Sequence, residues 1–362
     1  MNIKKRIEKT QKLIVSLGIE ALYLDDSIQL YYLTGLHLSA GCLVIWEYET
    51  LLLVDNRYSE LARQQTVVTV GELTKNSLKD RLNQKKTSTL GFSSTHTTYK
   101  KFQELQELPL VLKPLEDPLR PLRMIKDPEE IKLLENAAIL GSQGFDHVCQ
   151  ILHEGMTEAE AALQLELFWK THGGKQAAFD PIIAFGANGS MPHYRAGKST
   201  LTKGSAVLID IGVTLDHYHS DMTRMVYYGQ PSAQILEVHQ IVQKAQEEAL
   251  ALCKPGTKLG ALDKIAHDVI DHSPYPGTFT HSLGHGIGLE VHEFPFIRNS
   301  APFDQVALEE GMVITIEPGI YLPGIGGVRI ENTILITHSG YKDLTLRNPA
   351  PLILEKETSR HV

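Results

Sequence analysis

The sequence predicts an α/β protein, with helices and mixed strands (α+β), that is built from two domains. Its 362 residues exceed the roughly 100–200 residues of a typical single domain. Hydrophobic residues make up 42% of the chain and charged residues 22%, which is typical of a folded globular protein. The segment LEDPLRPLRMIKDPEE (115–130) is rich in proline and charge, which favours a linker. We therefore expect a front domain over residues 1–119 and a back domain over residues 120–362.

The front stretch alternates between helical and strand-like patterns. Residues 5–17 show helical periodicity. Short β-branched and aromatic runs then predict strands at ALYLDD, LYYLTG and GCLVIWEYETLLLVDNRY, and two more at TLGFS and LVLKPL. A helix is expected near residues 98–107. Together these elements predict a smaller mixed sheet with flanking helices.

The back stretch opens with a well-marked helix. Asp127 is a plausible N-cap, Pro128 occupies the first helical position, and two glutamates follow in the first turn. Further on, Thr157 and Glu160 have the spacing of a capping box, which predicts a second helix.

The second half of the sequence indicates an internal duplication. KGSAVLIDIG, which contains Asp210, is echoed by EGMVITIEPG, which contains Glu317, 107 residues later. SDMTRMVYYG, with Asp221, is echoed by IENTILIT, with Glu331, 110 residues later. Such weak repeats also arise by chance between strand segments bounded by glycine. If the duplication is real, two similar halves face each other and bring four carboxylates to one point.

Charge and cysteine content exclude several classes of partner. The net charge is −8, and no long Lys/Arg run marks a nucleic-acid or membrane patch, so we expect neither partner. The N-terminal segment indicates an amphipathic helix and not a signal peptide, and no window reaches the roughly 18 apolar residues of a membrane span. The three cysteines are far apart, which predicts free thiols and a cytoplasmic location.

A set of five side chains indicates a dinuclear metal site: Asp210, Asp221, His285, Glu317 and Glu331. Four carboxylates and one imidazole form a hard, oxygen-rich ligand set that suits divalent Mn, Co or Zn. Two such cations can hold a bridging hydroxide and polarise a carbonyl. Each acid alone would more often be a turn, cap or ion-paired residue. The prediction therefore depends on the joint pattern.

Histidines and one arginine extend this pattern. HSLGHGIGLEVHEFP places His281, His285 and His292 in a glycine-rich loop, and the glycines argue against a helix. Arg329 lies two residues before Glu331, so it points to the same face of a strand. It could orient a metal-bound carboxylate or form a plain strand salt bridge. By itself, His193 in PIIAFGANGSMPHYRAG carries no signal.

From Asp210 to Glu331 these motifs resemble those of the pita-bread metallopeptidases, which include methionine aminopeptidases, Xaa-Pro aminopeptidases and prolidases. The resemblance rests on D-I-G, S-D-M-T-R, the histidine-rich loop, I-E-P-G-I-Y and V-R-I-E-N. YYLTGLHLSAGCLVIWEYETLLLVDNRYSELA and LRMIKDPEEIKLLENAA are similar to the creatinase-like N-terminal domain and linker of the Xaa-Pro branch. The resemblance implies a pseudo-twofold pita-bread fold for the back domain.

It also implies a role for each ligand. Two divalent ions would bind, commonly Mn²⁺ in this branch, with Co²⁺ or Zn²⁺ as alternatives. Asp210 would chelate one ion, His285 and Glu317 the other, and Asp221 and Glu331 would bridge both. The bridging hydroxide would attack the carbonyl that precedes proline.

Further residues acquire roles through the same resemblance. Glu317 would be the general base, and His193 and His292 would polarise the carbonyl and stabilise the tetrahedral intermediate. His281 matches a substrate-pocket histidine, and we place Arg329 with it among the substrate-binding residues. The implied substrates are proline-containing peptides, and a homodimer is usual in this branch.

The chain departs from the family pattern at a few positions. Asn332 stands where an Asp often follows the bridging Glu, and Met225 stands where Thr is common. His217 and His219 crowd a hairpin where Gly is more usual. None of these changes removes a ligand.

Several functions remain open from the sequence. We favour an Xaa-Pro aminopeptidase that acts on longer peptides, with an Xaa-Pro dipeptidase (prolidase) as the alternative. Creatine hydrolysis on the same fold proceeds without metals, and the intact ligand set argues against it. A non-catalytic binding protein of this fold would typically have lost ligands, whereas all five are present.

Overall fold

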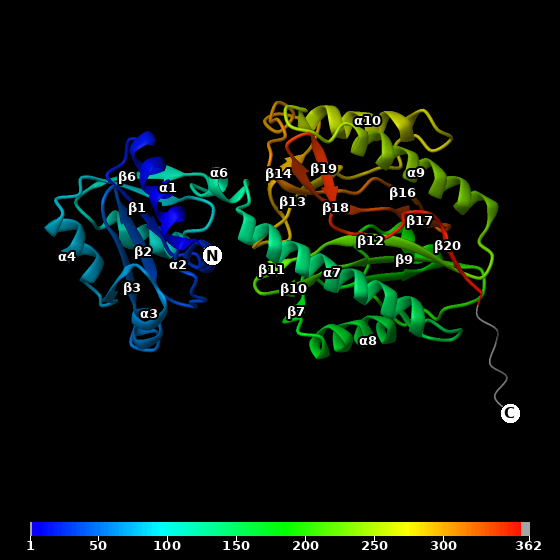
Figure 1. Cartoon of the computed structure of the whole chain (residues 1–362), viewed down its shortest axis with the longest axis horizontal. Helices are drawn as coiled ribbons and strands as arrows, with labels where there is room; N and C mark the ends of the chain where they lie inside the picture. The colour runs from blue at the N-terminus through cyan, green and yellow to red at the C-terminus, as the bar shows by residue number, and fades with distance from the viewer. Residues whose placement is uncertain (1, 356–362) are drawn as a thin grey trace. The chain divides into compact units, whose positions relative to one another are not determined.

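The computed structural model describes residues 2–355, and these form two compact units that divide between Arg123 and Met124. The division lies within the proline-rich segment 115–130. Both units combine helices with strands (Figure 1), so the predicted mixed α/β fold in two parts is confirmed. No helix within the described range is both long and apolar enough to cross a membrane.

The first unit is built around one mixed six-stranded sheet in the order β4-β3-β2-β1-β5-β6. Its strands are β1 (Ala21–Leu24), β2 (Cys42–Trp46), β3 (Thr50–Val54), β4 (Thr69–Glu72), β5 (Thr89–Ser93) and β6 (Val111–Leu115). Its helices are α1 (Ile3–Ser16), α2 (Ser27–Thr34), α3 (Ser59–Gln65), α4 (Ser77–Gln84), α5 (Tyr99–Gln106) and α6 (Arg120–Arg123). β1 pairs with β5 in parallel and with β2 in antiparallel fashion.

One strand predicted in the first unit is wrong. LYYLTG belongs to helix α2 and not to a strand. The side chain of Asp26 caps the helix by accepting hydrogen bonds from the N–H groups of Ile28 and Gln29, both at 3.0 Å. Gly35 ends the helix in the left-handed conformation, with a φ of 74°. Short apolar runs do not separate strand from buried helix by periodicity, so these two caps decide the outcome.

The second unit contains four helices, one 3₁₀ turn and four small sheets within its described residues. The helical elements are α7 (Pro128–Ile151), α8 (Glu158–Thr171), η1 (Gly186–Ser190), α9 (Ala233–Ala251) and α10 (Leu259–Asp271). The strands are β7 (Gln176–Ala177), β8 (Ile182–Phe185), β9 (Ser205–Ile211), β10 (Val213–Leu215), β11 (Tyr218–His219), β12 (Met222–Tyr228), β13 (Gly284–Gly286), β14 (Glu293–Ile297), β15 (Val313–Ile316), β16 (Gly319–Leu322), β17 (Gly326–Arg329), β18 (Asn332–Thr337), β19 (Gly340–Asp343) and β20 (Leu352–Leu354). The N-cap predicted at Asp127 of α7 and the capping box predicted at Thr157 and Glu160 of α8 are both present, and Asp127 also forms a capping box with Glu130.

The predicted duplication is visible in the second unit. We call α7 to β12 the first half and α9 to β18 the second half. Each half runs from two helices into an antiparallel strand pair, β9 with β12 and β15 with β18. Gly204 and Gly311 open the equivalent strands with φ angles of 93° and 91°. Their N–H groups donate to carbonyls near the far end of the partner strand, Tyr228 O in β12 and Ile336 O in β18.

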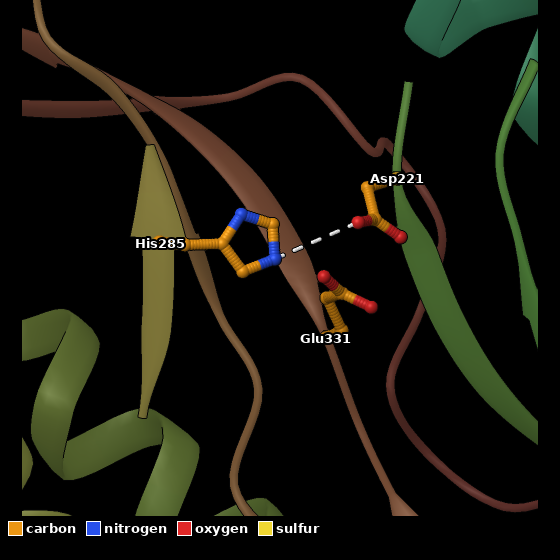
Figure 2. A group of neighbouring side chains, drawn as sticks. All are labelled: Asp221, His285 and Glu331. Carbon is orange, nitrogen blue, oxygen red and sulfur yellow. Dashed lines mark ion pairs between the residues drawn. The ribbon is translucent and has the colours of Figure 1, made fainter. Parts of the chain in front are cut away.

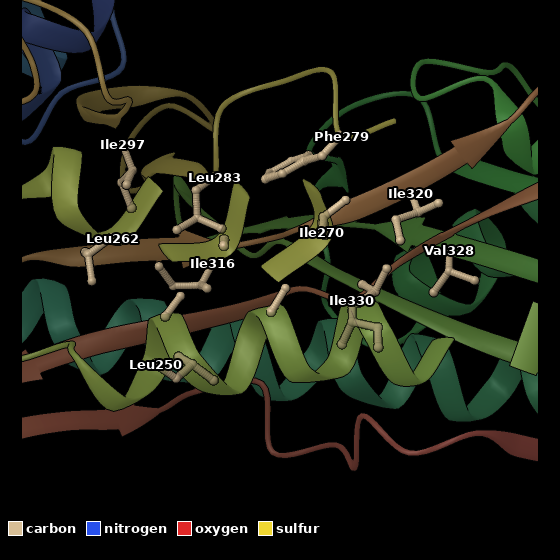
Figure 3. Packing of buried hydrophobic residues seen from close by; sticks show 14 of the residues in the cluster. Leu250, Leu262, Ile270, Phe279, Leu283, Ile297, Ile316, Ile320, Val328 and Ile330 are labelled. Carbon is tan, nitrogen blue, oxygen red and sulfur yellow. The ribbon is translucent and has the colours of Figure 1, made fainter. Parts of the chain in front are cut away.

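The core of the second half supports the strands that carry the predicted glutamate ligands. Figure 3 shows Ile316 and Ile330 among buried side chains that include Leu250 and Leu262 of α9 and α10. Both isoleucines are fully buried. Burial of each such side chain contributes about 1.5–3 kcal/mol. Because Ile316 and Ile330 directly precede Glu317 and Glu331, packing against the two helices helps to fix where the glutamates begin.

Candidate metal centre

The two aspartates of the first half lie on adjacent antiparallel strands. Asp210 is the last residue but one of β9, and Asp221 directly precedes β12. The register places Asp210 opposite Thr223 and Ile211 opposite Met222. The two carboxylates therefore start from the same end of the strand pair. Asp210 and Asp221 are both buried.

The second half contributes the remaining three predicted ligands. His285 lies within β13, Glu317 directly follows β15, and Glu331 directly precedes β18. β15 pairs with both β13 and β18, and Ile316 is opposite Asn332 at the end of the second pairing. The glutamates thus extend from neighbouring strand ends, next to the histidine strand.

All five predicted ligands line one cavity of about 910 Å³. Figure 2 shows Asp221, His285 and Glu331 directed toward one another, and each offers a ligand atom within 4.8 Å of the other two. His285 Nε2 is 3.7 Å from Asp221 Oδ2 and 3.4 Å from Glu317 Oε1. Asp210 lines the same cavity from the first half. The structure therefore brings the predicted set together from both halves.

The donor set fits divalent cations. Two buried carboxylate oxygens, Asp210 Oδ1 and Glu331 Oε1, have no hydrogen-bond partner among the residues that the structure describes. Burying such groups without compensation is costly. The Nδ1 atom of His285 is 3.0 Å from Gly286 O, so Nδ1–H donates there and Nε2 keeps a free lone pair facing the carboxylates. Oxygen acceptors without donors and an available imidazole nitrogen are what a metal ion needs.

The electrostatics of the cavity also favour a cation. Burial, and then repulsion from Glu331, raises the pKa values of Asp221 and Glu317 well above their usual range. Burial and the Asp210 charge raise the pKa of Glu331 to about 8. Burial and the neighbouring His292 lower the pKa of His285 to about 3, so its imidazole is neutral at pH 7. A bound cation would reverse this repulsion and favour ionised carboxylates.

Arg329 contacts a predicted ligand directly. Its guanidinium forms a buried ion pair with Asp210 Oδ2. It also donates to the hydroxyl of Tyr321 at 2.8 Å and to Thr223 Oγ1 at 3.2 Å. Thr223 in turn donates to Glu331 Oε2 at 2.7 Å. Of the two sequence interpretations, the geometry favours an orienting contact to a ligand carboxylate, because Arg329 links groups from both halves.

The three predicted non-ligand histidines line the same cavity but differ in their contacts. His193 and His292 are exposed to it, and the ring of His292 stands edge-on to His285 with centroids 4.3 Å apart. His281 Nδ1 is 2.9 Å from Ser282 O, and its Nε2 is 2.7 Å from the Tyr321 hydroxyl. With Nδ1–H donating and Nε2 accepting, His281 presents its ring to the cavity and has no N–H left to donate there.

Several contacting residues were not predicted from the sequence. Tyr321 and Thr223 lie inside the quoted motifs, but nothing in the motifs marked them as partners of Arg329. Thr315 Oγ1 accepts from His285 N–H at 3.1 Å and lies 3.4 Å from Glu317 Oε1. Asp263 of α10 lines the cavity and accepts from the N–H groups of residues 283 and 299, at 2.9 Å each. The last carries no sequence signal, because it lies in an ordinary amphipathic helix.

The structure gives physical reasons for two of the departures from the family pattern. Asn332 accepts from Arg224 Nη2 at 2.8 Å and donates to Asp343 Oδ2 at 2.7 Å, so its amide joins a buried cation to a carboxylate. His217 and Asp216 both adopt positive φ, 70° and 47°, in the tight turn between β10 and β11. That is the conformation for which glycine is usual.

Comparison with known proteins agrees with this geometry. The family described as Metallopeptidase family M24 matches residues 132–338, and the Creatinase/Prolidase N-terminal domain matches residues 6–125. The Xaa-Pro dipeptidase of Pyrococcus furiosus is 37% identical over 347 residues, which cover 95% of this chain and 98% of that protein.

Solved structures give the same result for the whole fold. The Xaa-Pro dipeptidase from Bacillus anthracis has a TM-score of 0.94 at 31% identity and covers 98% of this chain and 100% of that one. The X-Pro aminopeptidase from Thermotoga maritima has a TM-score of 0.88 at 33% identity and covers 96% of this chain and 100% of that one. Both specificities therefore occur on closely similar folds.

Proposed function

Since the chain belongs to metallopeptidase family M24, we propose that it hydrolyses the peptide bond preceding proline, with Xaa-Pro dipeptides as its preferred substrates. The observation that carries this proposal is the convergence of four carboxylates and one neutral imidazole on a single cavity. The near full-length similarity to an Xaa-Pro dipeptidase supports the choice of substrate. We expect Asp210, Asp221, His285, Glu317 and Glu331 to hold two divalent ions, with Mn²⁺ as the proposed metal.

Divalent ions held there would supply Lewis-acid polarisation of the scissile carbonyl and a water of lowered pKa. Glu317 is proposed to take the proton from that water at a carboxylate oxygen and to pass it to the proline nitrogen, which must be protonated before it leaves. A bound cation would favour the ionised form of Glu317, and a carboxylate is the form that can accept this proton. Its neighbour Thr315, 3.4 Å away, orients the carboxylate.

The exposed histidines would act on the substrate carbonyl. We propose that His193 and His292, which line the cavity, donate hydrogen bonds to the oxygen that becomes negative during attack. His281 contributes differently, because both of its ring nitrogens already have partners. Its ring would form part of the wall against which the substrate packs. Arg329 would act by holding Asp210 and Tyr321, not by contacting the peptide.

The cavity carries charges suited to both ends of a short peptide. The ligand carboxylates would attract the free amino group. Arg195 and Arg298 lie on the same lining and give a free carboxylate a cationic partner. Arg195 lies 3.4 Å from Asp180, and Arg298 lies over the ring of Phe296 with its guanidinium carbon 5.8 Å from the ring centroid. A dipeptide presents both charges within one small molecule, which favours dipeptidase activity.

An Xaa-Pro aminopeptidase, which the sequence favours, is the second candidate. The similarity to the Thermotoga maritima X-Pro aminopeptidase supports it. The cavity volume of about 910 Å³ is also within the range of sites that hold ligands larger than a dipeptide. The two candidates differ in whether residues after the proline are tolerated.

Mass spectrometry of products from purified, manganese-loaded protein tests the proposal. The substrates are an Xaa-Pro dipeptide, an Xaa-Pro-Yaa tripeptide and the same dipeptide with alanine in place of proline. We expect cleavage of the Xaa-Pro dipeptide and little cleavage of the others. Release of the first residue from the tripeptide would replace the dipeptidase assignment with the aminopeptidase. No cleavage of any peptide, or equal cleavage of the alanine control, would overturn the proposed function.

We also propose that the enzyme works as a homodimer in the cytoplasm. All three cysteines are free thiols, which suits a reducing compartment. Sedimentation equilibrium of the manganese-loaded protein tests the assembly, and a mass near 40.3 kDa would contradict the dimer.

A further inference from the structure

Helix α9 places one buried amide behind the two glutamate ligands. Gln246 is 1% exposed and lies on the face of α9 that otherwise carries the apolar side chains of Val242, Ala245 and Ala249. Its Nε2 is 3.1 Å from Ile316 O and 3.0 Å from Ile330 O. A polar side chain in an apolar stripe is costly unless its hydrogen bonds are made, and here they are.

The carbonyls of Ile316 and Ile330 lie immediately before the two glutamates of the site. Ile316 directly precedes Glu317, and Ile330 directly precedes Glu331. A carbonyl lies in the same rigid, planar peptide unit as the N–H of the next residue. A donor that holds these two carbonyls therefore holds the two peptide planes from which the glutamates begin. One amide group thus ties the start of Glu317 to the start of Glu331.

A third contact strengthens this link. Gln246 Nε2 is also 3.2 Å from Asn332 Oδ1, and Asn332 is the residue after Glu331. The two amide hydrogens are thus shared among three acceptors that lie on both sides of Glu331 and next to Glu317. Glu317 and Glu331 lie just outside the β15–β18 ladder, which ends with Ile316 opposite Asn332. Gln246 therefore adds a side-chain hydrogen-bond donor at the point where this ladder ends.

An apolar side chain of equal size could fill the same space but not the same role. It would leave the buried carbonyls without this donor, at about 1–3 kcal/mol for each group that loses its only partner. Each peptide plane would lose this anchor on its carbonyl side and keep the one on its N–H side, where Glu317 N–H donates to Leu283 O at 2.8 Å and Glu331 N–H donates to Thr223 O at 3.1 Å. Even small rotations matter at a metal site. Mutation of a residue that orients a metal ligand typically lowers metal affinity or activity about 10- to 100-fold.

We propose that Gln246 is a positioning residue that sets the spacing of Glu317 and Glu331 and thereby the affinity of the site for divalent metal. The inference rests on the proposed ligand roles of these two glutamates, but not on the identity of the peptide substrate.

The test replaces the amide and measures metal binding directly. Gln246→Met keeps the length of the side chain and removes both donors. We expect calorimetric titration of the full-length, metal-free protein with Mn²⁺ to show affinity reduced about 10- to 100-fold. The rate constant kcat for the best Xaa-Pro substrate should fall, with KM little changed, because the substrate does not touch Gln246.

A control on the same helix separates positioning from helix stability. Gln243 lies one turn earlier, and its amide donates to the exposed Glu247 at 2.8 Å. Gln243→Met should leave Mn²⁺ affinity unchanged. Mn²⁺ affinity in Gln246→Met equal to that of the wild-type protein would overturn the proposal.

A second substitution covers the case in which Gln246→Met does not fold. Gln246→Glu keeps the shape of the side chain and supplies at most one donor, so it should also bind Mn²⁺ more weakly than wild type. Wild-type affinity in that variant would equally refute the proposal. If the wild-type protein cleaves no Xaa-Pro peptide but the variants still lose Mn²⁺ affinity, the positioning role stands and the proposed function fails.

Discussion

The two halves of the second unit share a strand plan but support their ligands differently. In the first half, α7 approaches the Asp221 hairpin closely through Gly141, where an added Cβ would lie 2.6 Å from Ser220 Oγ. In the second half, α9 reaches its strands through the long side chain of Gln246. Helix α7 is thus held by close packing at Gly141, and helix α9 by the hydrogen bonds of the Gln246 side chain. Duplication preserved the placement of the carboxylates and not the means of holding them.

Each half also contributes an arginine that contacts a residue of the other half. Arg329 of the second half pairs with the carboxylate of Asp210 in the first half. Arg224 of the first half donates to the backbone carbonyl of Glu331 in the second. The first contact is an ion pair with the carboxylate of Asp210. The second is made to the backbone of Glu331 and not to its carboxylate. Neither half can complete the support of its own ligands, so the site exists only where the halves meet.

The largest effect is expected from removing the second half's proposed general base. Glu317→Ala should reduce kcat by about 10²–10⁴-fold, the usual contribution of general acid–base catalysis, and metal loss would add to this. The fold should persist, because the substitution relieves a buried, repelled carboxylate. Steady-state kinetics and circular dichroism measure the two effects. Glu310→Ala, an exposed site just before β15, is the control, and full activity in Glu317→Ala would contradict the mechanism.

The direct ion pair between halves should come next. Arg329→Met leaves Asp210 buried without its cationic partner, which typically costs about 3–5 kcal/mol. Bound metal supplies an alternative positive charge, so the loss should be smaller with saturating Mn²⁺ than without it. Urea unfolding in both conditions measures the difference. An identical loss with and without Mn²⁺ would mean that the ion pair does not serve the metal site.

Close packing in the first half predicts a smaller, purely steric effect. Gly141→Ala would bring a methyl group within 2.6 Å of Ser220 Oγ, next to Asp221. Overpacking of this kind typically costs about 1–3 kcal/mol. Gly340→Ala is the matched control, because a Cβ there meets nothing within 4 Å. Thermal unfolding compares the two, and equal melting temperatures would show that α7 can move away without penalty.

The sequence indicated which acids and histidines gather at the cavity better than it indicated the contacts that hold them there. Acids and a histidine at strand ends are recognisable, because buried carboxylates need partners and their spacing repeats between the halves. Gln246 is separated from Ile316 and Ile330 by 70 and 84 residues and lies in a helix of ordinary composition, so only the folded chain shows its role. LYYLTG was misassigned for a related reason, since its helix depends on caps at both ends and not on its own pattern.

The smallest effect is expected at the neutral link behind Glu331. The amide of Asn332 connects Arg224 to the carboxylate of Asp343, whereas Arg329 contacts the carboxylate of Asp210 directly. Asn332→Asp would place two carboxylates side by side, and Asp343→Asn would remove the carboxylate from the chain of contacts. Each single change should destabilise the metal-free protein by about 1 kcal/mol, within the usual range for point substitutions.

The double variant Asn332→Asp/Asp343→Asn should recover most of the lost free energy of unfolding. It keeps one amide and one carboxylate, and its carboxylate at residue 332 lies beside Arg224. Burial lowers the pKa of Arg224 to about 10, and the Asp343 charge is the largest influence opposing that shift, which shows that the two groups interact. A double-mutant cycle from urea unfolding should therefore give a coupling energy of about 0.5–3 kcal/mol. Strictly additive losses would mean that Arg224 holds Glu331 through its backbone contacts alone, and that the support of this ligand is independent of charge.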